Sequence, residues 1–481
     1  MEFSWDRYHG FTKRLSSLVG QWPYQNKKEK LLRMSITTTA VLVMHVPQVC
    51  KFFNCNKDLN CIFGTVPVYI LVLVIILKLY MGNLRSNKIK ALTDRVFIDW
   101  KRLRNQQEYE IMMTYVASAR WIVRFYFTIC LITCIIFVSV ALIPHILDVI
   151  LPLNESRPIV LPYEAYYFVD ERKYFFYIFL QGVITIHICL MVLLAYDTMF
   201  MTFVEHVCGI FAVAGFRFGS LVRKDIDDVK IVNNDLGDTY NKRMACCVNA
   251  HWAALEFAEH LENTFSLNIG IELLVVTIGI SITLFQVTLR SGDTVEAVRY
   301  VLYVLAQMVH LFIFCWEGQR LIDHSLLMRD KIYSCTWYKK SAKSQRLILD
   351  VLQRSLRPKF LSAGKVFIFS LQGFTTVTLQ SDDSLEALRY LIYVIIQFVH
   401  MFVFCWEGQR LIDHSLLIHD KIYSCSWYKK PAKSQRLIMH VLKRSLQPKF
   451  LSGGRMFIFS LQGFTTVVQT SMSYFTVLSS V

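Results

Sequence analysis

The sequence is poor in charged residues, and this scarcity excludes several classes of protein. Asp, Glu, Lys and Arg make up 18% of its 481 residues, whereas apolar residues make up 54% and the mean hydropathy is +0.38. A soluble surface needs more charge than this, so the composition favours a membrane protein. The net charge of +16 does not indicate nucleic-acid binding, because Lys and Arg occur in blocks between long apolar runs and not on one basic face.

The motifs of the common enzyme classes are also missing. The sequence has no Gly-rich phosphate loop, no Cys and His set at metal-ligand spacing and no serine elbow. We therefore expect no enzyme activity, no metal and no cofactor. His251 and His260, or Asp413 with His414, are more simply explained as solvated or packed side chains.

The cysteines do not indicate a disulfide framework. Their number, 13, is odd, and several lie inside apolar runs, where a thiol packs as a small hydrophobe. Cys50, Cys55 and Cys61 flank one short loop, and a single bridge there stays an open alternative. No small-residue cleavage site follows the first apolar stretch, so we interpret it as a retained span and not as a signal peptide.

Long apolar runs predict a polytopic helical protein. A helix needs about 20 apolar residues to cross the hydrocarbon core, because its backbone groups must be satisfied internally. The weakest candidate, 366–380, holds a run of only about 15 apolar residues, so it is expected to cross thinly, to re-enter or not to cross. The nine candidates are residues 34–53, 61–82, 122–147, 174–203, 266–289, 299–316, 366–380, 389–406 and 456–480.

The basic residues predict the orientation of these spans. Lys and Arg are dense in the N-terminal tail and in alternate loops, whereas residues 54–60 have one Lys and residues 148–173 carry an excess of acids. Because positive loops stay on the cytoplasmic side, the N-terminus is predicted to be cytoplasmic and, with nine spans, the C-terminus external. Asn154, in the sequon Asn154-Glu155-Ser156, lies in a loop that this rule places outside, so it is a candidate glycosylation site.

A long internal repeat divides the chain. Residues 291–380 recur as 381–470 with about 65 of 90 positions identical, far more than structural repeats usually keep. We interpret it as two coding blocks that are duplicated or joined, and a transporter-type repeat is the alternative. The predicted domains are 1–290 with the tail and spans one to five, 291–380 with span six, a cytoplasmic segment and part of span seven, and 381–481 with a second copy and the complete last span.

Motifs at the end of the chain carry a family resemblance. In order and spacing they resemble the C-terminal signature of insect odorant receptors: Cys405-Trp406-Glu407-Gly408-Gln409-Arg410, Trp427-Tyr428, Arg444-Ser445-Leu446-Gln447-Pro448 and Ser473-Tyr474-Phe475-Thr476-Val477-Leu478. The start, Gly20-Gln21-Trp22-Pro23-Tyr24-Gln25, is similar to hymenopteran receptors. The resemblance implies an all-α transmembrane bundle of the seven-span odorant-receptor fold, here with a duplicated pair of spans, up to nine in all.

The resemblance also implies a function. It is that of an odorant-binding subunit of a ligand-gated, non-selective cation channel in the plasma membrane of olfactory dendrites, forming a heterotetramer with a shared co-receptor and binding volatile small molecules. The loop 204–265 lacks the long insertion expected of the co-receptor, which favours a ligand-tuning subunit. The alternatives are a gustatory-type receptor channel, a G-protein-coupled receptor, whose N-terminus would face outward, and a transporter.

Two groups of site residues follow from the family pattern. It places a hydrophobic constriction of the pore at Val477 in the last helix, with Val481, Ser473 and Ser480 nearby. It also implies that a cytoplasmic segment anchors the subunits together. Its apolar face would be formed by Leu437, Ile438, Val441 and Leu442, and a helix on the membrane surface is the alternative.

The ligand pocket is expected in the outer halves of the spans, because an apolar odorant needs a dry pocket with a few polar or aromatic groups. The candidates are Tyr69, Val72, Phe137, Val140, Ile143, Tyr177, Gln181, Tyr390 and Tyr393, although a Tyr at this depth also suits an interfacial anchor. Tyr300 and Tyr303 compete with the last two. His310 and His400 follow Gln307 and Gln397 by three residues, and such intramembrane groups are either functional or bonded to a neighbouring helix.

Overall fold

The computed structural model describes residues 4–55, 58–151, 157, 161–228, 236–289, 294–333, 342–356, 358–363 and 367–374, and beyond these only short pieces between 409 and 469. The chain divides into two compact units, Met1–Asp382 and Asp383–Val481. Each is described by itself.

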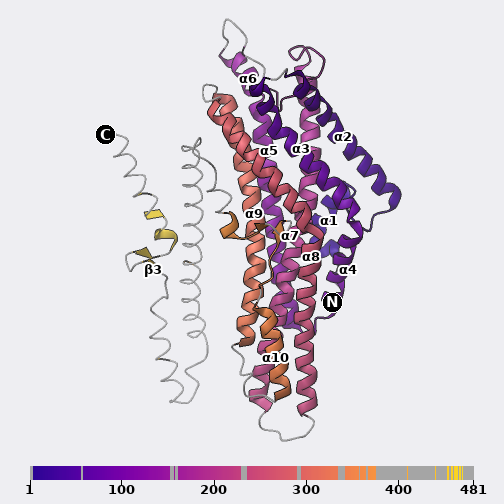
Figure 1. Cartoon of the computed structure of the whole chain (residues 1–481), viewed down its shortest axis with the longest axis vertical. Coiled ribbons are helices and arrows are strands. Elements are labelled where there is room, and N and C mark those ends of the chain that lie inside the picture. The colour runs from indigo at the N-terminus through magenta and orange to yellow at the C-terminus, as the bar shows by residue number, and fades with distance from the viewer. Residues whose placement is uncertain are drawn as a thin grey trace. The chain divides into compact units, whose positions relative to one another are not determined.

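The first unit is a bundle of α-helices, four of which are long and run side by side (Figure 1). The all-α fold predicted from the sequence is confirmed. Its elements are α1 (Trp5–Leu18), α2 (Lys27–Asn54), α3 (Leu59–Leu84), α4 (Ser86–Lys101), α5 (Gln106–Val140), α6 (Ile143–Ile150), α7 (Phe175–Asp228), α8 (Leu236–Leu289), α9 (Thr294–Tyr333), α10 (Ala342–Ser355), β1 (Ser362–Ala363) and β2 (Phe367–Ile368).

Five helices within the described residues are long and apolar enough to cross a membrane. Helix α2 contains the predicted span 34–53, α3 contains 61–82, α8 contains 266–289 and α9 contains 299–316. Helix α7 contains 174–203 except for its first residue, and α5 covers only 122–140 of 122–147. The five are Lys27–Asn54, Gly64–Leu84, Gln106–Val140, Phe175–Phe218 and Arg299–Tyr333.

Two of these helices end elsewhere than predicted. The helix expected over 122–147 is α5, which begins earlier, because the Asn105 side chain accepts a bond from the Glu108 backbone N–H (2.8 Å) and Glu108 accepts one from the Arg104 backbone N–H (2.8 Å). The arrangement resembles a capping box, except that the Glu108 carboxylate accepts from the residue before the N-cap Asn105. The same helix stops at Val140, since Pro144 opens a new short helix. Helix α7 continues well past 203 to Asp228.

The stretch predicted to span from 366 begins differently. Residues 367–368 form β2, which pairs antiparallel with β1 through Ser362↔Ile368 and Ala363↔Phe367, and helix begins only at Leu371. The candidate span 366–380 is therefore not helical at residues 367–370. The hairpin lies against Gly318 of α9, where an added Cβ would overlap the carbonyl oxygen of Phe369, so the close approach requires glycine.

The described pieces of the second unit repeat this local structure. Strands β3 (Ser452–Gly453) and β4 (Phe457–Ile458) pair antiparallel in the same register as β1 and β2. The Leu461 backbone N–H donates to Gln409 Oε1 at 3.4 Å, as the Leu371 N–H donates to Gln319 Oε1 at 3.4 Å. The sequence repeat is thus also a repeat of backbone pairing.

Helix α10 is the first copy's counterpart of the predicted anchor segment, whose own residues Leu437, Ile438, Val441 and Leu442 lie outside the described residues. Ile348 and Val351 of α10 are buried, at 4% and 0% exposure, where the helix packs on α8 and α9. Leu347, beside them, is 40% exposed. Most of this apolar face therefore packs within the chain.

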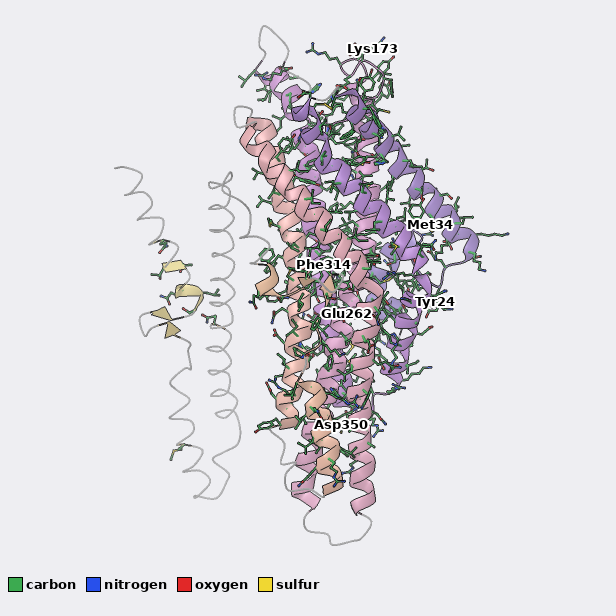
Figure 2. The ribbon with its side chains drawn as sticks, in the orientation of Figure 1. Tyr24, Met34, Lys173, Glu262, Phe314 and Asp350 are labelled. Carbon is green, nitrogen blue, oxygen red and sulfur yellow. A yellow bond between two sulfur atoms is a disulfide. The ribbon has the colours of Figure 1, made fainter. Side chains whose placement is uncertain are left out.

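The turn between α2 and α3 is closed by a disulfide between Cys55 and Cys61, whereas Cys50 is free. The sequence left open whether this loop holds a disulfide, and the structure contains one. Figure 2 labels Phe314 of α9, which lies midway along the bundle. Its ring stacks on Phe200 of α7 with ring centroids 5.2 Å apart.

Candidate functional site

An apolar cavity of about 200 Å³ lies among α3, α5, α7, α8 and α9. Aliphatic, aromatic and Cys side chains form most of its walls, because these helices turn their apolar faces toward one another. Representative wall residues are Val68, Leu71, Cys134, Phe137, Leu190 and Val276.

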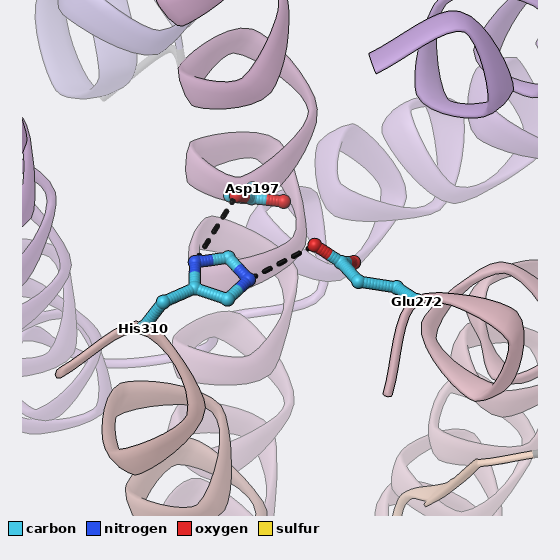
Figure 3. Close-up of side chains that lie close together, drawn as sticks. All are labelled: Asp197, Glu272 and His310. Carbon is cyan, nitrogen blue, oxygen red and sulfur yellow. Dashed lines mark hydrogen bonds and ion pairs between the residues drawn. The ribbon is translucent and has the colours of Figure 1, made fainter. Parts of the chain in front are cut away.

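A buried ionic cluster joins the wall of this cavity. The Lys78 ammonium of α3 lies 2.6 Å from Asp197 Oδ1 of α7 and 2.6 Å from Glu272 Oε1 of α8. His310 Nε2 of α9 lies 2.9 Å from the same Glu272 oxygen (Figure 3). The Tyr126 hydroxyl of α5 donates to Asp197 Oδ2 at 2.8 Å and lies 2.7 Å from His310 Nδ1. Five helices therefore meet through polar contacts in the apolar core.

Three members of the cluster, Tyr126, Glu272 and His310, line the cavity itself. Burying an unpaired charge is costly, and the contacts across helices offset that cost. Asp197, Glu272 and His310 place one ligand atom each within 4.8 Å of one another, a spacing that a metal ion could use. The Lys78 ammonium already bonds both carboxylates, so the cluster has its own cation and does not favour a metal centre.

A second buried ion pair connects two motifs, residues 205–209 and residues 315–320, of which the latter is the first-copy counterpart of residues 405–410. Arg320, from Cys315-Trp316-Glu317-Gly318-Gln319-Arg320, pairs with Glu205, from Glu205-His206-Val207-Cys208-Gly209, and donates to Ser118 Oγ at 2.9 Å. Glu205 is 1% exposed. The two motifs are thus parts of one contact that ties α9 to α7 and α5.

The predicted pocket residues occupy different environments. Phe137 lines the cavity, and so does Tyr303 of the first copy. Val72 and Val140 are buried, but Ile143 is 36% and Tyr177 75% exposed.

The remaining two candidates have other partners. Tyr69 stacks on His45 with centroids 5.0 Å apart, and Gln181 Oε1 accepts a bond from the Tyr167 hydroxyl at 2.9 Å. The other predicted site residues lie outside the described residues: Asn154, Tyr390, Tyr393, His400, Ser473, Val477, Ser480 and Val481.

Sequence reasoning singled out His310 but not the residues that bond to it. Lys78, Asp197 and Glu272 are charged residues within apolar runs, and that is a recognised signal of function in a membrane. Each of these residues could therefore have been selected from the sequence by itself. That they pair with one another could not be predicted, because the three lie far apart in the sequence.

Comparisons with known proteins agree with this architecture. The family model described as 7tm Odorant receptor matches residues 58–381 and again residues 373–472, so the repeated block is matched by a second, shorter stretch. Odorant receptor 22c of Drosophila melanogaster is 25% identical over 175 residues, 34% of this chain and 41% of the relative. The odorant receptor coreceptor of Ooceraea biroi is 27% identical over 130 residues, 27% of each chain. The chain thus spans less than half the length of these curated relatives.

A solved structure shows the same fold. The insect olfactory receptor OR5 from Machilis hrabei, in complex with eugenol, superposes with a TM-score of 0.62 at 12% identity, covering 82% of this chain and 99% of the other. The matched proteins are receptors and not enzymes, which confirms the prediction from the sequence that this chain has no enzyme activity. With the family model matching most of its length and several apolar helices that suit a multi-pass membrane protein, the chain belongs to the insect odorant receptor family.

Proposed function

We propose that this chain is the odorant-binding subunit of a ligand-gated, non-selective cation channel that works with a shared co-receptor. The observation that carries the proposal is the apolar cavity among α3, α5, α7, α8 and α9 in a chain of the odorant receptor family. Its volume of about 200 Å³ lies below the roughly 300–1,000 Å³ of drug-sized pockets. A small, mostly apolar volatile molecule suits it.

Ligand binding would reach the rest of the channel through α9. This helix lines the cavity at Tyr303 and His310, and farther along it carries Gly318, against which the hairpin packs. A ligand that fits the cavity better in one arrangement of these helices shifts the channel toward that arrangement by its difference in affinity. The proposed pore constriction is at Val477, with Ser473, Ser480 and Val481 nearby.

Assembly with a co-receptor is the second part of the proposal. Its first support is that proteins named odorant receptor coreceptor are among the relatives. Its second is that residues 204–265 lack the long insertion expected of the co-receptor, which favours the ligand-tuning role. The proposed complex is a heterotetramer in the plasma membrane of sensory dendrites, anchored in part by Leu437, Ile438, Val441 and Leu442.

Current recordings test the function directly. We expect odorant-evoked inward current when the chain is expressed with a co-receptor, with similar currents in sodium and potassium solutions. The controls are cells that express this chain alone and cells that express the co-receptor alone, each with surface labelling of the expressed protein. If the pair reaches the surface and a broad panel of volatiles evokes no current above that of the co-receptor alone, the proposed function is wrong.

A further inference from the structure

Two buried oxygen atoms on the cavity-lining residues lack hydrogen-bond partners among the described residues. They are Glu272 Oε2 and Gln307 Oε1. Glu272 is 4% and Gln307 8% exposed, so bulk water does not reach them freely. Buried polar atoms in native proteins are nearly always bonded, and an unbonded one indicates a missing partner.

Both atoms are hydrogen-bond acceptors. The other Glu272 oxygen, Oε1, already contacts Lys78 Nζ at 2.6 Å and His310 Nε2 at 2.9 Å. A carboxylate has room for further donors on its second oxygen. What the cavity lacks is therefore a donor.

Three of the hydroxyl groups along the walls already have partners elsewhere, and a fourth, that of Tyr303, lies against the Gln307 side chain. Tyr126 donates to Asp197 Oδ2 at 2.8 Å, and Thr133 donates to the Ile129 carbonyl at 2.9 Å. Tyr163 is bonded to the Tyr167 hydroxyl at 2.7 Å. With these donors engaged, the donor for Glu272 Oε2 has to enter with the molecule that fills the cavity.

We propose that the cavity selects odorants that carry a hydroxyl group, alcohols or phenols, whose O–H donates to Glu272 Oε2 while the apolar body contacts the remaining walls. Gln307 offers a second acceptor on α9. This inference rests on the proposed function, since it names the ligand class of the same cavity. Ethers, ketones and alkanes of equal size bring no donor, so they leave the carboxylate oxygen unbonded.

The preference should be about tenfold in affinity. An odorant hydroxyl donates to the buried carboxylate oxygen, whereas an ether of equal size leaves that acceptor unbonded, and a buried acceptor without a donor lowers the affinity by about tenfold, which is about 1.4 kcal/mol. The expected order at equal chain length is alcohol first, with ether, ketone and alkane about tenfold weaker or more.

Binding and gating are measured separately. Thermal stabilisation of the purified receptor complex by a matched series of alkanol, methyl ether, ketone and alkane reports binding whether or not current flows. Current from the same complex reports the proposed function. Equal stabilisation by alkanol and ether, or none by any alkanol, would overturn the ligand class. Stabilisation by alkanols without current would uphold the ligand class and contradict the channel.

Variants locate the preference. Glu272→Gln replaces one oxygen by a donor, so the preference for alcohol over ketone should fall by about tenfold or reverse. Because Glu272 also pairs with Lys78, Gln307→Leu serves as a second variant that leaves the ionic cluster intact, and it should reduce the preference in part. Val276→Leu, one helical turn from Glu272, is the matched control, which changes ligand size limits but keeps the ratio of alcohol to ether. If Glu272→Gln and Gln307→Leu both keep the wild-type ratio, as Val276→Leu should, the assignment to Glu272 is wrong.

Discussion

Loss of the Lys78 charge is the perturbation that most directly tests the buried cluster. In Lys78→Met the two carboxylates that lie 2.6 Å from the ammonium lose their shared cation, while Met fills similar space. Asp197 is 0% and Glu272 4% exposed, so water cannot replace the lost charge. Removing one partner of a buried ion pair lowers the free energy of unfolding by about 3–5 kcal/mol. Here two carboxylates lose their cation, so we expect a loss at the upper end of that range. The ratio of folded to unfolded receptor should fall several thousandfold, since about 5 kcal/mol is lost and about 1.4 kcal/mol is a factor of ten.

The assay is surface expression together with the melting temperature of the solubilised receptor. Lys51→Met is the matched control, because the Lys51 ammonium is partly exposed and lies 3.6 Å from Glu164, an arrangement worth about 0–1 kcal/mol. A triple variant, Lys78→Met with Asp197→Asn and Glu272→Gln, should recover much of the loss, since a cluster without net charge needs no cation. If Lys78→Met behaves like Lys51→Met in both measurements, the cluster does not stabilise the bundle and the reasoning is refuted.

Three further predictions follow from other parts of the bundle. Phe137→Ala should change the odorant concentration for half-maximal current by about tenfold or more, because it removes part of the cavity wall. Tyr177→Ala, at a residue 75% exposed, should change that concentration less than about twofold. Equal effects of the two variants would contradict the cavity as the ligand site. Gly318→Ala should reduce surface expression, because the added methyl group would overlap the Phe369 backbone beside the hairpin. Gly10→Ala is the control and should leave expression unchanged, because no neighbouring atom lies within 4 Å of the added methyl group. Unchanged expression of both variants would refute the close approach. Burial lowers the pKa of His251 from 6.5 to about 4, so its packing against α10 should hold fully above pH 6.5 and weaken as pH falls toward 4. Amide exchange in α10 measures this, and an exchange rate as dependent on pH in His251→Gln as in the wild type would contradict it.

The helices could be predicted from the sequence because a membrane requires long uninterrupted apolar runs. The positions of α3 and α9 follow from hydropathy alone, and the start of α5 could have been found from the capping pair Asn105 and Glu108. The extension of α7 past residue 203 could not, since outside the membrane a helix persists through packing against its neighbours. The hairpin at 362–368 was missed because it depends on contact with Gly318, which no local pattern reveals.

The candidate site, too, could be predicted from the sequence only in part. Helical spacing shows that residues share a face, but which face turns inward depends on neighbouring helices, and so Phe137 lines the cavity while Tyr177 is exposed. The ionic cluster could be suspected from charges in apolar runs, but its connections join residues from five helices. These contacts are long-range, and one sequence does not contain them.

The repeat offers a last test, because the two copies can be exchanged. Deleting residues 381–470 leaves the first copy joined to the final segment, and deleting 291–380 leaves the second. Both products have the same length and the same single set of spans after residue 290. They differ mainly in which copy supplies the counterpart of α9.

At the cavity the copies differ in size but not in polarity. Gln307 and His310 of the first copy have identical counterparts in Gln397 and His400, whereas Ala306 is replaced by the larger Ile396. If α9 forms the cavity wall, the receptor that keeps the second copy should favour shorter odorants and still prefer alcohols to ethers, because its acceptors are unchanged. Dose-response curves for a series of alkanols, normalised to surface expression, measure the shift. The same optimum chain length in both receptors would show that this face of α9 does not contact the ligand. The cavity would then not be the odorant-binding site.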